Sequence, residues 1–83
     1  MMYHVYILLC KDGSYYTGYT KNLEFRLEQH VLGRGARYTR MHKPKKLVYL
    51  EEFATRREAM IRERQIKHLT HDEKLKLASS RVK

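Results

Sequence analysis

The stretch that decides the fold is residues 3–20, which read YHVYILLCKDGSYYTGYT. Tyr3–Cys10 is rich in β-branched and aromatic residues and is too short for a stable helix, and Ser14–Thr20 has a similar character. Between them, Lys11-Asp12-Gly13 has the composition of a hairpin turn. Residues 3–20 therefore predict two antiparallel strands joined by a tight turn.

After the hairpin the apolar pattern becomes helical. Leu23, Leu27 and Val31 recur at helical spacing, and Gly33 ends the run. Residues 33–46, GRGARYTRMHKPKK, are dominated by cations and polar side chains. We expect a helix positioned by its apolar stripe and, after it, an exposed basic segment.

The rest of the chain reads as one strand and two helices. Leu47–Phe53 has the composition of a strand, and Thr55–Glu58 and Thr70–Glu73 are capping boxes that each begin a helix. The resulting order is ββαβαα. It predicts a single α/β (α+β) domain over residues 1–83, with a small three-stranded, mainly antiparallel sheet flanked by helices.

The composition limits the class of protein. The chain has 83 residues, 18 Lys+Arg against 9 Asp+Glu, and a formal net charge of +9. Its one cysteine, Cys10, excludes an internal disulfide framework and a Cys-rich zinc site, and we expect it to be a small core residue. No apolar stretch approaches about 20 residues and no signal peptide is evident, so we expect a cytoplasmic protein without a membrane partner. The positive charge favours polyanions as partners.

Several polar side chains fall on faces that should meet the sheet. On the helix after Thr55, Glu63 shares a face with Ala59 and Ile66. A carboxylate there is costly unless it is paired or bound to a metal. Glu63 is therefore either paired with a neighbouring arginine or functional. On the earlier helix, Arg26 and His30 flank the leucine stripe, where they are either a solvated flank or part of a site.

These residues resemble a known family. Val5-Tyr6, followed ten residues later by Tyr16-Thr17-Gly18, resembles the paired signature of the GIY-YIG endonucleases. The resemblance covers nearly the whole chain, and the short stand-alone bacterial members are the most similar. It continues in order through Lys21-Asn22-Leu23, Arg26, His30 and Glu63.

The resemblance implies a metal-dependent nuclease and a role for each matching residue. Family members hydrolyse DNA phosphodiesters with Mg²⁺ or Mn²⁺. Tyr6 and Tyr16 match the tyrosines that orient or deprotonate the attacking water or contact the phosphate. Arg26 matches the arginine that neutralises the scissile phosphate, and His30 a position that assists proton transfer. Glu63 matches the single carboxylate that holds the metal.

General chemistry agrees with these residue types. A guanidinium can neutralise two phosphate oxygens, and a lone carboxylate leaves most of a Mg²⁺ shell to water and phosphate. A tyrosine, with a pKa near 10, needs a cation or a neighbouring donor to act as a base. The sequence departs from the family at His4, where Gly is usual, and at Tyr19, where some members have a lysine that could activate the base. A late polar residue that some members use near the metal has no match that we can place.

A shared site for both tyrosines requires one hairpin register. A two-residue turn would place Tyr6 and Tyr16 on opposite faces of the sheet. A three-residue turn with Gly13 in the left-handed region places Tyr6 opposite Gly18, and Tyr16 opposite Leu8, on one face. We therefore predict the three-residue turn, with Gly18 leaving room for a phosphate beside Tyr6.

The basic segment supplies the expected DNA track. Tyr38 and Thr39 are expected to stack or to form hydrogen bonds, and the cations to contact phosphates. These cations are Arg34, Arg37, Arg40, Lys43, Lys45 and Lys46. No recognition helix or zinc finger is evident in the sequence, which favours structure-guided or nonspecific binding.

The sequence thus predicts a divalent-metal-dependent endonuclease that acts on DNA in repair or recombination. The alternative is a catalytically weak DNA- or RNA-binding module of the same fold, with RNA the less favoured partner. A carboxylate on the core face favours the enzyme, because a binding module has no need of it. The sequence identifies no recruiting protein.

Overall fold

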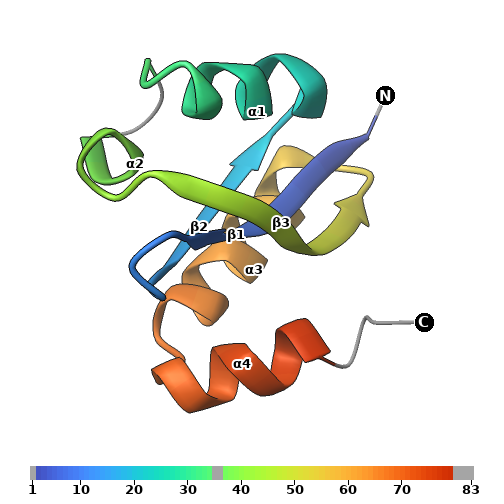
Figure 1. The fold of residues 1–83 in the computed structure, drawn as a ribbon. Helices are drawn as coiled ribbons and strands as arrows, with labels where there is room; N and C mark the ends of the chain where they lie inside the picture. The colour runs from blue at the N-terminus through green and yellow to red at the C-terminus, as the bar shows by residue number, and fades with distance from the viewer. Residues whose placement is uncertain (1, 35–36, 80–83) are drawn as a thin grey trace.

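A three-stranded antiparallel sheet lies between two pairs of helices in the computed structural model, which describes residues 2–34 and 37–79 (Figure 1). The strands are β1 (Tyr3–Cys10), β2 (Tyr15–Thr20) and β3 (Pro44–Phe53), in the order β2-β1-β3. The helices are α1 (Leu23–Val31), α2 (Arg37–Met41), α3 (Arg56–Lys67) and α4 (His71–Ser79). The predicted fold class is confirmed, with the short helix α2 added to the predicted elements.

The β1–β2 hairpin has the predicted three-residue turn. The Cys10 amide donates to the Ser14 carbonyl at 2.8 Å, and Gly13 has φ +87°, in the left-handed region. Tyr6 consequently pairs with Gly18, and Leu8 with Tyr16. The turn therefore places both signature tyrosines on one face of the sheet.

The main hydrophobic core lies on the other face, beneath α3 and α4. Because side chains alternate along β1, Val5 and Ile7 point into this core while Tyr6 points toward α1 and α2. Val5 and Ile7 are fully buried there together with Ala59 and Ile66 of α3. Cys10 is buried, as predicted.

Most of the described residues in 33–46 are exposed, as predicted, but the segment contains secondary structure that the sequence did not predict. Residues Arg37–Met41 form α2, and β3 begins at Pro44 rather than at Leu47. Two register shifts between β1 and β3 extend the ladder as far as Pro44. A proline is tolerated there because the first residue of an edge strand does not need its N–H for the ladder.

Helix α1 begins and ends where predicted, but it buries a different residue. The Asn22 side chain accepts a hydrogen bond from the Phe25 amide at 3.1 Å, and Gly33, at φ +76°, follows the last turn. Val31, part of the predicted apolar stripe, is 76% exposed, whereas His30 is 1% exposed. The imidazole can be buried because both of its nitrogens find hydrogen-bond partners.

Both predicted capping sequences begin a helix. The Thr55 hydroxyl accepts from the Glu58 amide, and the Thr70 hydroxyl accepts from the Glu73 amide, each at 3.2 Å. Helix α4 is attached to the hairpin through His71, whose Nε2 lies 2.9 Å from the Gly13 carbonyl oxygen. Among the described residues, none of the helices is long and apolar enough to cross a membrane.

Candidate active site

A buried chain of hydrogen bonds joins three elements above the tyrosine face of the sheet. The Tyr6 hydroxyl of β1 lies 2.9 Å from Nε2 of His30 in α1. The other ring nitrogen of His30, Nδ1, lies 2.7 Å from the Thr39 hydroxyl of α2. All three residues are at most 1% exposed. Bulk water therefore does not compete directly for these hydrogen bonds.

Burial sets the protonation states of this pair. Desolvation, assisted by the nearby positive charge of Arg26, lowers the pKa of His30 below its usual value of 6.5, so the imidazole is neutral at pH 7. Desolvation, together with the negative charges that Tyr16 and Glu63 can carry, raises the pKa of Tyr6 to about 12, although Arg26 opposes this rise. At neutral pH the pair is thus an intact phenol beside an imidazole that can accept a proton.

Tyr16 extends the site toward the surface. Its ring centroid lies 6.3 Å from that of Tyr6 and 5.1 Å from that of His30. On α2, the Tyr38 ring stacks with Tyr16 at 5.8 Å and with His42 at 4.3 Å, and His42 hydrogen-bonds to Asp12 in the hairpin turn. This row of rings ties α2 to the hairpin.

Gly18 is required by the position of Tyr6. A Cβ atom built on Gly18 would lie 2.6 Å from the Tyr6 hydroxyl oxygen and 3.1 Å from Cε2 of Tyr16. The space beside Gly18 therefore holds the Tyr6 hydroxyl, and the prediction that it is kept for a phosphate is wrong.

Glu63 lies on α3, which contacts β2, β1 and β3. Its side chain is 19% exposed, and its charge is near enough to contribute to the raised pKa of Tyr6. Its ion-pair partner is Lys67, whose Nζ lies 3.6 Å from a Glu63 oxygen, whereas Arg62 donates to Glu51 at 2.9 Å. The sequence predicts a neighbouring arginine as the ion-pair partner of Glu63, and the structure shows a lysine instead.

The donor set near Glu63 limits which metal could bind. Within residues 2–34 and 37–79, no group of three or more His, Cys, Asp or Glu side chains is placed to hold a metal. A site built on one carboxylate suits Mg²⁺ or Mn²⁺, which keep several water molecules and accept phosphate oxygens as ligands. Glu63 therefore fits a substrate-shared ion rather than a metal enclosed by protein ligands.

Comparison with known proteins agrees with this geometry. The family model of the GIY-YIG catalytic domain matches residues 2–76. The chain belongs to the GIY-YIG family. A UPF0213 protein of Clostridium perfringens is 56% identical over 80 residues, covering 96% of this chain and 86% of the relative. A second UPF0213 protein, from Staphylococcus saprophyticus, is 49% identical over 77 residues, covering 93% of this chain and 94% of the relative.

Two solution NMR structures share the fold. The UPF0213 protein of Bacillus halodurans superposes with a TM-score of 0.63 at 46% identity, over 98% of this chain and 86% of that one. A protein of E. faecalis gives a TM-score of 0.66 at 39% identity, over 96% and 85%. The predicted resemblance to the small stand-alone bacterial GIY-YIG proteins is confirmed.

The structure brings most of the predicted catalytic residues of this GIY-YIG chain together. Tyr6, Tyr16 and His30 are in ring contact or hydrogen-bonded. Arg26 is near enough to lower the pKa of the Tyr6 hydroxyl. Glu63 is linked to this group by its charge, which contributes to the raised pKa of Tyr6.

The predicted DNA-contact residues are divided between surface and interior. Arg34, Arg37, Tyr38, Arg40 and Lys45 are exposed. Thr39 is buried against His30, so its prediction as a surface contact is wrong. The ring of Tyr38 already stacks with two other rings, which limits its use as a platform for a nucleobase.

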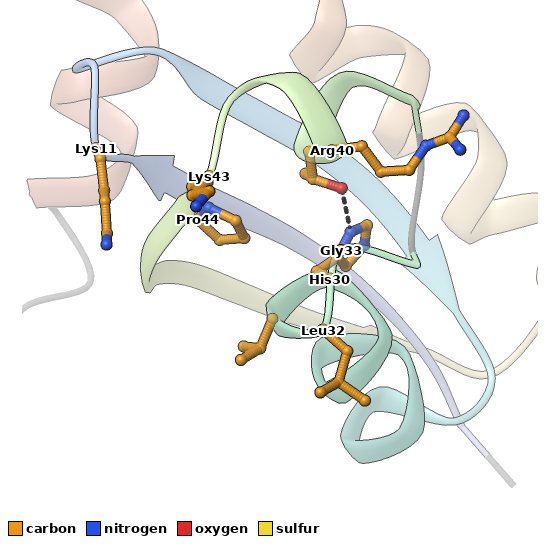
Figure 2. A pocket seen from close by; sticks show the side chains of 9 residues that line it. Lys11, His30, Leu32, Gly33, Arg40, Lys43 and Pro44 are labelled. Atoms are coloured by element: carbon orange, nitrogen blue, oxygen red, sulfur yellow. Dashed lines mark hydrogen bonds between the residues drawn. The ribbon is translucent and has the colours of Figure 1, made fainter.

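A hollow beside His30 adds a feature that the sequence did not indicate (Figure 2). It has a volume of about 380 Å³, and its lining includes His30, Thr39 and three cationic side chains. These cations are Lys11 of the hairpin turn, Arg40 of α2 and Lys43. The Lys11 amide donates to the Lys43 carbonyl at 2.8 Å, which brings the two segments together. This long-range contact helps to place Lys11 near the predicted DNA track.

Proposed function

We propose that this GIY-YIG chain is a cytoplasmic, divalent-metal-dependent endonuclease that hydrolyses DNA phosphodiesters. We further propose that it recognises DNA structure or backbone rather than sequence, and that it acts in repair or recombination. The observation that carries the proposal is the buried hydrogen bond between Tyr6 and neutral His30, with the Arg26 guanidinium beside it. This arrangement combines a proton acceptor with a charge that suits a phosphate.

Proton removal from the attacking water depends on Tyr6 and His30 acting together. A phenol with a pKa of about 12 is a poor base by itself at neutral pH. If Tyr6 passes its proton to His30 as it receives one from water, the imidazole becomes the final acceptor. His30 is suited to this step because it is held neutral and within hydrogen-bond distance of Tyr6.

Arg26 and Tyr16 are the groups that we expect to meet the phosphate. Both are half-buried, whereas Tyr6 is fully buried. When the guanidinium turns from Tyr6 toward phosphate oxygens, it would open the Tyr6 hydroxyl to the attacking water. Preorganised positive charge at the reacting phosphate stabilises the charge that develops in the transition state.

Glu63 would hold the divalent ion. When bound, Mg²⁺ or Mn²⁺ supplies Lewis-acid stabilisation of the leaving oxygen. On the protein side, the carboxylate would have to exchange its ion pair with Lys67 for the metal.

The exposed cations of α2 and β3 support a path for the DNA backbone. Arg37 and Arg40 project from α2, and the hollow near His30 brings Lys11 and Lys43 to the same region. Contacts of this kind bind phosphate charge without reading bases, which agrees with nonspecific or structure-guided recognition. RNA remains the less favoured substrate in this proposal.

A paired substitution tests the catalytic proposal. Tyr16→Phe removes the hydroxyl expected to contact the phosphate, while Tyr15→Phe makes the same change on the adjacent residue, which packs against the core on the other face. Cleavage of supercoiled and branched DNA with Mg²⁺ or Mn²⁺ should fall about 100-fold in Tyr16→Phe. Equal rates in the two variants would contradict the assignment.

One observation favours the alternative of a catalytically weak DNA- or RNA-binding module. Lys67 already pairs with Glu63 at 3.6 Å and can compete with a metal for its charge. This alternative predicts nucleic-acid binding without metal-dependent cleavage. Titration of Mn²⁺ into the parent and into Lys67→Ala distinguishes the two proposals, with paramagnetic broadening of the NMR signals near Glu63 as the readout. Broadening only in Lys67→Ala supports the binding module.

A further inference from the structure

Thr39 is a buried polar residue that has no role in the chemistry proposed above. Its hydroxyl lies 2.7 Å from Nδ1 of His30, the hydrogen bond drawn at His30 in Figure 2. Thr39 and His30 are each 1% exposed. Thr39 is on α2, so this contact crosses between helices and is not a local feature of α1.

A neutral imidazole offers one donor and one acceptor, so the chain of hydrogen bonds has two forms. In the first, Nδ1–H donates to Thr39 and Nε2 accepts from the Tyr6 hydroxyl. In the second, Thr39 donates to Nδ1, and Nε2–H donates to the Tyr6 oxygen. Only the first form leaves Nε2 able to take the proton of Tyr6.

The surroundings of Tyr6 favour the first form. The nearby Arg26 guanidinium lowers the pKa of Tyr6, and because a guanidinium has only donors it can offer the Tyr6 phenol oxygen a donor but offers the Tyr6 O–H no acceptor. In the second form the same oxygen would also accept from His30, and the buried Tyr6 O–H would need another acceptor. A buried donor left without an acceptor is costly. The first form gives the Tyr6 O–H and both ring nitrogens of His30 a partner, with the Thr39 oxygen as the acceptor at Nδ1.

We propose that Thr39 is a positioning residue that accepts the Nδ1–H of His30 and so keeps Nε2 ready to receive the proton of Tyr6. The inference rests on the proposed nuclease function, because it assigns Thr39 a purpose in that proton transfer. Thr39 itself does not touch the substrate.

The contacts of α2 explain how so short a helix can hold a hydroxyl in place. Tyr38 stacks on Tyr16, and His42 stacks on Tyr38 while bonding to Asp12 of the hairpin turn. These contacts fix α2 on either side of Thr39 in sequence. The position of the hydroxyl is therefore set by the hairpin as well as by α1.

The experiment compares three threonine variants. Thr39→Val keeps the shape of the side chain and removes the hydroxyl, and Thr39→Ser restores a hydroxyl. Thr17→Val is the matched control, because Thr17 is also buried but lies in β2, and its hydroxyl has no hydrogen-bond partner within the described residues. The readouts are the ¹⁵N shifts of the His30 ring by NMR and the single-turnover rate of DNA cleavage.

In the parent, Thr39→Ser and Thr17→Val, we expect His30 to carry its proton on Nδ1. In Thr39→Val we expect the Nε2–H form or a mixture, and cleavage about 100-fold slower with DNA affinity unchanged. A merely structural role would not change the tautomer selectively and would not be rescued by serine.

Two other results have separate meanings. An active parent whose tautomer and rate are the same in Thr39→Val, or a parent with the Nε2–H form, overturns the inference and leaves the nuclease standing. A parent with Nδ1–H that cleaves no DNA overturns the proposed function, and with it the purpose assigned to Thr39.

Discussion

Gly18→Ala should disturb the candidate active site from a position without any functional group. The added Cβ would lie 2.6 Å from the Tyr6 hydroxyl oxygen and 2.8 Å from Cζ. To reach an ordinary contact of 3.4 Å, the hydroxyl would have to retreat by about 0.8 Å. Tyr6 is fully buried and bonded to His30 at 2.9 Å, so its ring cannot simply swing into solvent. Overpacking of this kind costs about 1–3 kcal/mol of stability.

The assay measures both stability and chemistry. Urea unfolding should show the loss of stability, and single-turnover cleavage should fall about 100-fold because the Tyr6–His30 hydrogen bond is stretched or broken. Gly13→Ala is the control: its φ of +87° predicts a cost of about 1–2 kcal/mol, but nothing lies within 4 Å of the added Cβ. Gly18→Ala with the stability and rate of the parent would refute the reasoning.

Four further predictions address the other groups. Arg26→Lys should bind DNA nearly as well as the parent but cleave about 100-fold more slowly, because lysine lacks the planar fork; equal single-turnover rates would reject this role. Glu63→Gln should stay folded and bind DNA in a gel-shift assay, with metal-dependent cleavage at background. Replacing Arg37 and Arg40 by Ala should lower the log–log salt slope of DNA binding by about one unit per lost phosphate contact. Burial lowers the pKa of His30, so its ring stays neutral below pH 6.5, and a pH–rate profile should show its acid limb below that value. The stability linked to neutral His30 should be lost as pH falls through the folded pKa.

The parts of the fold that were predicted correctly have local signals. The three-residue turn depends on Gly13, and the starts of α3 and α4 depend on capping boxes that lie within four residues. Such features are stabilised by neighbours in sequence. A pattern within a few residues is therefore enough to predict them.

Helix α2 and the buried face of α1 depend instead on contacts between distant residues. Stacking of Tyr38 on Tyr16 and the hydrogen bond of Thr39 to His30 place α2, and no periodic pattern in residues 33–46 announces either contact. The same hydrogen bonds make His30 a buried residue while its neighbour Val31 faces solvent. Hydrophobic periodicity does not identify a polar side chain that can be buried because its hydrogen-bonding groups have partners.

The candidate site also combines features that local sequence predicts with features that depend on distant contacts. The common face of Tyr6 and Tyr16 follows from the hairpin register, and the register could be predicted. The filling of the space at Gly18 by the Tyr6 hydroxyl could not, because it depends on where His30 holds that hydroxyl. Sequence reasoning thus identified the groups, and the structure specified which of them are in contact.

The central claim is that this GIY-YIG chain cleaves DNA with a divalent metal. The most direct test incubates the purified protein with supercoiled plasmid and with branched DNA, in Mg²⁺ or Mn²⁺ and in EDTA, beside a His30→Ala variant prepared identically. We expect nicked or linear products that require the metal and are lost in His30→Ala. Intact DNA under every condition, or equal cleavage by the His30→Ala variant, would contradict it.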